Sequence, residues 1–93
     1  MPYIKQDDRR GKDGYIDALD NQIITAGDLN YTITRLVHNW MASQESSLGD
    51  KYSARYATHN TAIGVLECSK LELYRRLTAP YEDKVMAENG DVR

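Results

Sequence analysis

The stretch from Ser53 to Leu77 most constrains how this chain can fold, because its pattern predicts one long helix with two apolar faces. At 3.6 residues per turn, one arc of about a third of the circumference carries most of the large apolar side chains. We expect this arc to face the core of the domain. It consists of His59, Ala62, Ile63, Leu66, Lys70, Leu73 and Leu77.

A second line of small or apolar residues lies nearly opposite that arc. A glycine inside a helix costs about 1 kcal/mol relative to alanine, so Gly64 suggests that another backbone comes close. A 93-residue chain can hardly cover both faces by itself. We therefore expect a self-complementary contact with another copy of the chain; the alternative is that Gly64 is merely tolerated and the first two helices cover both faces. The expected interface residues are Ala57, Gly64, Cys68 and Leu71.

Length and composition bound the rest. Residues 1–93 form a single domain, and a chain of this size buries only about 60% of its unfolded surface. The single cysteine forms no internal disulfide, so oligomerisation is the expected source of further stability. We expect Cys68 to be a small buried hydrophobe in a reducing compartment, not a nucleophile. The net charge of −2 argues against non-specific binding of nucleic acid.

Neither a membrane span nor a signal peptide is expected. No apolar run approaches the roughly 18 residues of a span, and Met1-Pro2-Tyr3 does not begin a signal peptide. We expect a cytoplasmic protein. Its seven tyrosines and absence of phenylalanine suit wet interfaces and ligand pockets better than a dry core.

The chain before the long helix predicts shorter elements. Residues 1–12 are expected to form an extended or flexible lead-in, because charges and two glycines crowd residues 6–14. Apolar residues at steps of three and four predict a first helix over about 13–25, ended by Gly27.

A second amphipathic helix is expected from Asp28 to about Ser43, with Asp28 or Thr25 as its N-cap. The polar segment 44–52 predicts a surface loop. Ser53 is the expected N-cap of the long helix that follows.

Pro80 predicts a kink or break at residues 78–79, because a proline inside a helix removes a hydrogen bond and clashes with the preceding turn. A short fourth helix is expected from Pro80 to Asn89, where Asn89-Gly90 stops it before a loose tail at 90–93. The predicted fold is an all-α bundle of three main helices plus a short C-terminal helix, which oligomerises through the long helix.

Motifs for catalysis or metal binding are weak. His38 and His59 have no ligand partner at suitable spacing, so no metal and no cofactor are expected. We expect no enzyme. A small nucleotide hydrolase that uses Glu67, Glu72 or Glu82 as its base is a remote alternative.

A basic and aromatic cluster is the best candidate for a binding site. Arginine forks pair bidentately with phosphate or carboxylate, and tyrosine rings stack on planar groups. The alternative is that Arg75 pairs within the chain with Glu72, Glu82 or Asp83. The candidate ligand-binding residues are Tyr3, Lys5, Tyr31, Arg35, Tyr74, Arg75, Arg76 and Tyr81.

Three segments carry a family resemblance: MPYIK at the start, GDLNYTITRL in the middle and YRRLTAPYEDKVMAENGDV at the end. Together they resemble an uncharacterised family of short proteins from tailed phages and scattered bacterial and archaeal genomes. The resemblance spans nearly the whole chain; Asp28 stands where the family pattern has Glu. The resemblance implies a phage origin, and it does not imply any activity.

The expected function is therefore non-enzymatic binding. In a host-cell cytoplasm, the protein would be a counter-defence sponge that holds a nucleotide-like anionic ligand at a subunit interface. The alternative is an adaptor or inhibitor that acts on a host protein through its tyrosine-rich face.

Overall fold

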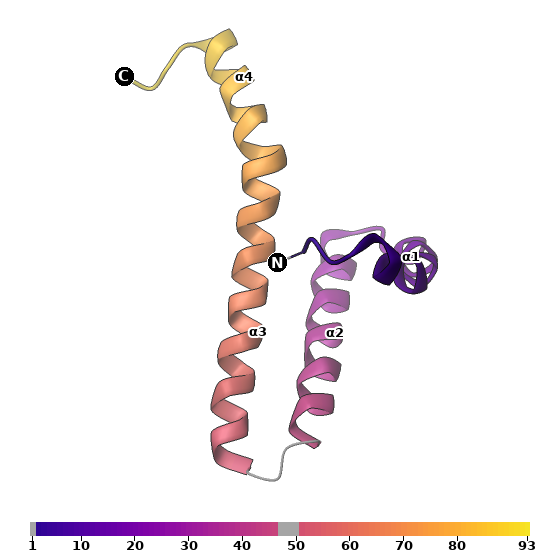
Figure 1. Ribbon diagram of the computed structural model, residues 1–93. Helices are drawn as coiled ribbons and strands as arrows, with labels where there is room; N and C mark the ends of the chain where they lie inside the picture. Colours follow the sequence, from indigo (N-terminus) through magenta and orange to yellow (C-terminus); the bar gives the residue numbers. More distant parts are fainter. Residues whose placement is uncertain (1, 47–50) are drawn as a thin grey trace. The chain divides into compact units, whose positions relative to one another are not determined.

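The computed structural model describes the backbone of residues 2–46 and 51–93, and the side chains of 2–44 and 56–93 (Figure 1). Within these ranges every regular element is helical and there is no strand, which confirms the all-α class. The elements are α1 (Gln6–Asp20), α2 (Ala26–Ser46), α3 (Lys51–Leu73), the π-helical turn η1 (Tyr74–Thr78) and α4 (Ala79–Asn89).

The chain divides into two units, residues 2–62 and residues 63–93, and each is described by itself. The boundary falls inside α3. The arrangement of the helices as a bundle therefore stays a prediction.

Helix α1 begins and ends earlier than predicted. It already starts at Gln6, so the non-helical lead-in is limited to residues 2–5 among those described. Asp7 and Asp8 lie in its first turn, where the helix dipole favours acidic side chains. Asp7 also pairs with Arg10 at 3.4 Å, one turn along. These local charge interactions outweigh the two glycines that argued for an exposed turn.

A capping box connects the end of α1 to α2. The Asp28 amide donates to Thr25 Oγ1 at 3.0 Å, while the Thr25 and Ile24 amides donate to Asp28 Oδ2 at 3.0 and 3.1 Å. This confirms Thr25 as the cap of the second helix. The predicted helix end at Gly27 was wrong, because Gly27 lies in the first turn of α2.

The connection between α2 and α3 is shorter than the predicted loop 44–52. Helix α2 continues to Ser46 and α3 begins at Lys51, so residues 47–50 lie between them, outside the described residues. Ser53 lies within α3, not before it, and its side chain is outside the described ones.

Few described side chains are buried. Thr58 and Ala62, one turn apart on α3, are the two described residues with less than a tenth of their surface exposed to solvent, at 5% and 4%. On α2 of the same unit, Val37, Met41 and Gln44 are half-buried at steps of four and three. Burial in the first unit therefore follows one helix face in each of these two elements.

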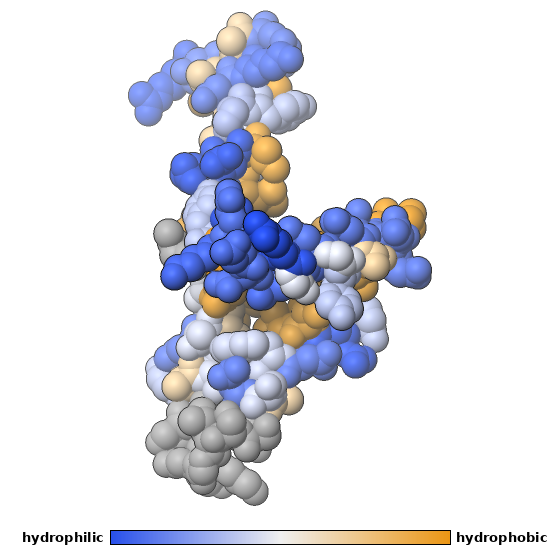
Figure 2. All heavy atoms as spheres, turned by 45° about the vertical axis from the view of Figure 1, so that its right-hand side comes forward, coloured by the Kyte–Doolittle hydropathy of each residue, from blue (hydrophilic) through white to orange (hydrophobic). Residues whose placement is uncertain are grey.

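Most of the predicted core arc is exposed. Only Ala62 is buried, and Cys68, expected to be buried, is exposed as well. Figure 2 shows apolar side chains at the surface along the helices, between polar ones. Within the second unit, the helix and its tail do not bury the large apolar side chains of the arc. The exposed apolar members are Ile63 at 66%, Leu66 at 36%, Leu73 at 56% and Leu77 at 64%.

The second unit is one uninterrupted run of helix, followed by a tail (Figure 1). A kink or a break was predicted at residues 78–79; the helix does not break there, and its irregularity is the π-helical turn η1. In η1 the amide of Ala79 donates to the carbonyl of Tyr74, five residues back, so the turn widens just before Pro80. A wider turn accommodates a residue that lacks an amide hydrogen and crowds the turn before it. Gly90, with a φ of 93°, ends α4 as predicted.

Candidate functional site

Tyr31 and Arg35 form the first cluster of predicted binding residues. They lie one turn apart on α2, and Arg35 Nη1 donates to the Tyr31 hydroxyl at 3.1 Å. The guanidinium carbon also lies 5.9 Å from the centre of the Tyr31 ring. Both side chains are exposed. The tyrosine therefore holds the cation in place without neutralising it.

Arg75 is paired within the chain. Its Nη2 donates to both carboxylate oxygens of Glu72 at 3.0 Å. This is the internal pairing that the sequence left open as the alternative to an anion site. Arg76 has an interaction of its own as well. The two arginines of η1 are thus less available to an anionic ligand than the sequence suggested.

Tyr74 and Glu82 connect η1 to α4. The Tyr74 hydroxyl donates to Glu82 Oε2 at 3.0 Å, across eight residues of chain. This hydrogen bond and the negative charge of Glu82 raise the pKa of the Tyr74 hydroxyl. Both effects favour the protonated hydroxyl, since ionisation would remove the donor and place two negative charges together. Glu82 was not among the predicted ligand-binding residues. The sequence feature that could have pointed to this contact is Pro80, two positions earlier, because it marks the widened turn that the contact crosses.

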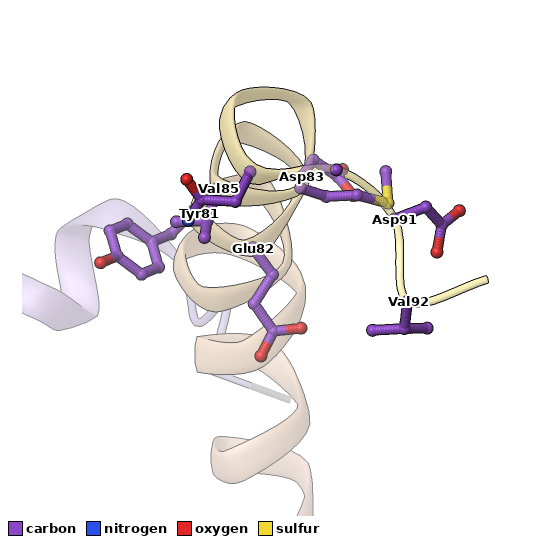
Figure 3. A pocket seen from close by; sticks show the side chains of 9 residues that line it. Tyr81, Glu82, Asp83, Val85, Asp91 and Val92 are labelled. Carbon is purple, nitrogen blue, oxygen red and sulfur yellow. The ribbon is translucent and has the colours of Figure 1, made fainter.

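Tyr81 lines a hollow of about 430 Å³ between α4 and the C-terminal tail (Figure 3). Its ring points away from the tail, whereas Asp83 lies toward Asp91 and Val92. With Glu82, the lining contains three carboxylates. Such a lining disfavours an anion. The structure thus places Tyr81 beside acidic groups instead of in the expected basic pocket.

The remaining candidates lie at the start of the chain. Tyr3 and Lys5 belong to the non-helical segment before α1, and both are exposed. The segment is held to α1 by Arg9, whose Nε donates to the carbonyl of Ile4 at 2.9 Å.

The eight candidates form local pairs and no described common site. Four of them belong to the first unit and four to the second. Within the first unit the structure brings Tyr31 and Arg35 together. Within the second, Tyr74 and Arg75 each bind a carboxylate. Whether the two groups share one site stays a prediction.

The predicted interface line is open to solvent. A Cβ built on Gly64 would meet nothing within 4 Å, so no described backbone of the same chain approaches it. Leu71 is 54% exposed. Its use as an interface therefore stays a prediction. Ala57, Gly64 and Cys68 are exposed too.

Neither a metal site nor a membrane-spanning helix is found among the described residues. Among the described residues, no group of three or more histidine, cysteine, aspartate or glutamate side chains could hold a metal ion. In the same part of the chain, no helix combines the length and the apolar character that crossing a membrane requires.

Comparison with known proteins gives a family and no activity. No curated protein and no solved structure matches the chain. A family model described as a domain of unknown function, DUF6899, matches residues 1–92. This agrees with the expected membership of an uncharacterised family. Because the match covers nearly its whole length, the chain belongs to the DUF6899 family.

Proposed function

We propose that the protein is a non-enzymatic binding protein that works through protein–protein contact, and that its first partner is another copy of itself. The observation that carries the proposal is the exposure of its large apolar side chains. Tyr15 and Ile24 are each 82% exposed, and Leu77 is 64% exposed. Exposed apolar surface on this scale marks interaction sites.

The proposal commits to a second copy of the chain as the partner. A second copy is present wherever the chain is made, and symmetric homo-oligomers are the commonest assemblies.

The test is the dependence of size and helicity on concentration. We expect light scattering coupled to size exclusion to give a defined oligomer at micromolar concentration. We also expect far-ultraviolet circular dichroism to show helix loss on dilution, because the isolated helices are marginal. A monomer whose helicity and melting do not change with concentration would contradict the proposal.

A second candidate function is binding of a nucleotide-like anion, as in a counter-defence sponge. The pair of Tyr31 and Arg35 favours it, because Arg35 makes no ion pair with any other described residue. An oriented, exposed guanidinium beside an aromatic ring suits phosphate and a planar base.

This candidate is tested by thermal melts with inorganic phosphate and with cyclic and linear nucleotides. A nucleotide that raises the melting temperature of the wild type should lose its effect in Arg35→Ala. It should keep its effect in Arg75→Ala, since Glu72 already holds that arginine. Indifference of the wild type to every anion would remove the candidate.

A further inference from the structure

Tyr31 and Arg35 lie on the polar side of α2. At about 100° per residue, Tyr31 is about 170° and Arg35 about 130° from the middle of the helix's apolar side. An amphipathic helix packs through its apolar side and keeps its polar side in water. The pair therefore stays accessible whichever element packs on α2. Four large residues that recur at steps of four, three and four mark the apolar side: Leu29, Ile33, Leu36 and Trp40.

An open hollow of about 550 Å³ lies along α2 beside the Tyr31 ring. Ala26 and Gly27, about one turn before Tyr31, have little or no side chain and leave this space unfilled. Aromatic side chains bind planar bases by stacking, so the hollow gives room for a planar group against the ring. The lining residues are Ala26, Gly27, Asn30, Tyr31 and Thr34.

The hydrogen bonds around this hollow leave donors unused. Arg35 Nη1 donates to the Tyr31 oxygen at 3.1 Å, so the proton of the Tyr31 hydroxyl remains available. The Thr34 hydroxyl donates to the side-chain oxygen of Asn30 at 3.3 Å and thereby orients its amide. No described residue accepts a hydrogen bond from the Asn30 amide nitrogen. These side chains suit a ligand that supplies acceptors.

Arg35 provides the positive charge of this surface. Its guanidinium makes no ion pair with another described residue. Asp28, the acidic residue on the same side of α2, lies about 10 Å away along the axis at 1.5 Å per residue. Its Oδ2 already accepts two backbone amides. A single guanidinium matches one phosphate group, which it binds through two parallel hydrogen bonds.

From these observations we infer that the polar side of α2 binds a small ligand in which one phosphate group is joined to a planar heteroaromatic ring, as in a nucleoside monophosphate. Arg35 pairs with the phosphate, and the ring stacks on Tyr31. The Asn30 amide donates to an acceptor at the edge of the ring. The inference rests on the second candidate function; it names the class of ligand and adds Asn30 to the binding residues.

The separate halves of one nucleotide test this assignment. The probes are inorganic phosphate, adenosine, adenosine monophosphate and adenosine triphosphate, titrated into the nitrogen-15-labelled full chain and followed by amide NMR shifts. We expect the monophosphate to shift amides of residues 26–35 and to bind at least about tenfold tighter than either half, because one molecule makes both contacts. The triphosphate should bind no more than about threefold tighter than the monophosphate, since one guanidinium is present.

Each substitution should affect one half of the ligand. Arg35→Ala should reduce the affinity for the monophosphate to that for adenosine and leave adenosine binding unchanged. Asn30→Ala should raise the dissociation constants of adenosine and of the monophosphate equally, about fivefold, the effect of one lost hydrogen bond. Asn60→Ala is the matched control, because Asn60 is an exposed asparagine on α3. Circular dichroism checks that the helix content of each variant is that of the wild type.

The outcomes separate the inference from the function on which it rests. A chain indifferent to every probe would overturn both. Monophosphate binding that shifts amides outside residues 26–35, or that neither Arg35→Ala nor Asn30→Ala weakens, would overturn the inference and leave anion binding in place. Phosphate alone binding as tightly as the monophosphate would overturn the ring contacts. Tighter binding of a short single-stranded oligonucleotide would overturn the free nucleotide as the ligand.

Discussion

The Tyr74 hydroxyl donates a hydrogen bond to Glu82 at 3.0 Å, across the only π-helical turn among the described residues. The turn lies just before Pro80, and the bond joins its first residue to α4. A proline that would normally break a helix is here accommodated by a wider turn, and the helix runs on to Asn89.

The ionisation of Tyr74 should depend on Glu82. Since Glu82 raises the pKa of the Tyr74 hydroxyl in the folded state, the bond stabilises the fold below the usual tyrosine pKa near 10 and is lost as the pH rises through the higher folded value. We expect Glu82→Gln to lower the pKa of Tyr74 in an NMR titration of ring-labelled tyrosine. An unchanged Tyr74 pKa would contradict the contact.

Replacing Pro80 should alter the turn before it more than the helix content. In Pro80→Ala the helix no longer needs a wide turn and can return to regular α-helical geometry. Eight residues of a regular α-helix would offset Tyr74 and Glu82 by about 80°, so we expect equal or higher helicity by circular dichroism together with a fall in the pKa of the Tyr74 hydroxyl, because its bond to Glu82 is lost. Pro2→Ala, at the chain's other proline, is the control. An unchanged Tyr74 pKa in Pro80→Ala would show that η1 does not bring the two side chains together.

The capping box should matter to the stability of α2. Thr25→Ala removes the oxygen that accepts the Asp28 amide, and we expect it to lower the free energy of unfolding by about 1 kcal/mol in urea denaturation. Thr34→Ala is a matched control, because the Thr34 hydroxyl donates within the helix, to the backbone carbonyl and the side-chain oxygen of Asn30, and caps no helix end. An equal effect of the two substitutions would argue against the cap.

The same box should respond to acid. The amides of Thr25 and Ile24 lower the pKa of Asp28, so its contribution to stability is present above the usual aspartate pKa and is lost as the pH falls through the lower folded value. We expect part of the acid-induced loss of stability to disappear in Asp28→Asn. A pH profile identical to that of the wild type would contradict the assignment.

Gly64→Ala should stabilise the helix. The added Cβ meets nothing within 4 Å, so the substitution gains about 1 kcal/mol of helix propensity in thermal unfolding without a clash. Self-association should not weaken, because the added Cβ meets nothing within 4 Å. A substitution that raises helicity but dissociates the oligomer would instead show a close backbone contact at Gly64.

Parts of the chain were predictable because local chemistry decides them. The helical class, the cap at Thr25 and the helix end at Gly90 follow from residue types and spacing. The start of α1 was missed, since charges in its first turn outweigh Gly11 and Gly14. Pairing of Arg75 within the chain was predicted with Glu72, Glu82 or Asp83 as the partner, and the structure selects Glu72; spacing alone does not decide among acids that are all within reach.

The sequence by itself determined that the chain is helical and that its long helix carries apolar faces, since both depend on periodicity and propensity. Only the tertiary structure decided that the large apolar side chains of the second unit are not buried within that unit and that Pro80 is accommodated without a break. The physical reason is that burial and a π-helical turn depend on which atoms meet across the chain and around a turn. A pattern of residue types predicts which helix faces are apolar, but it does not predict which element packs against them.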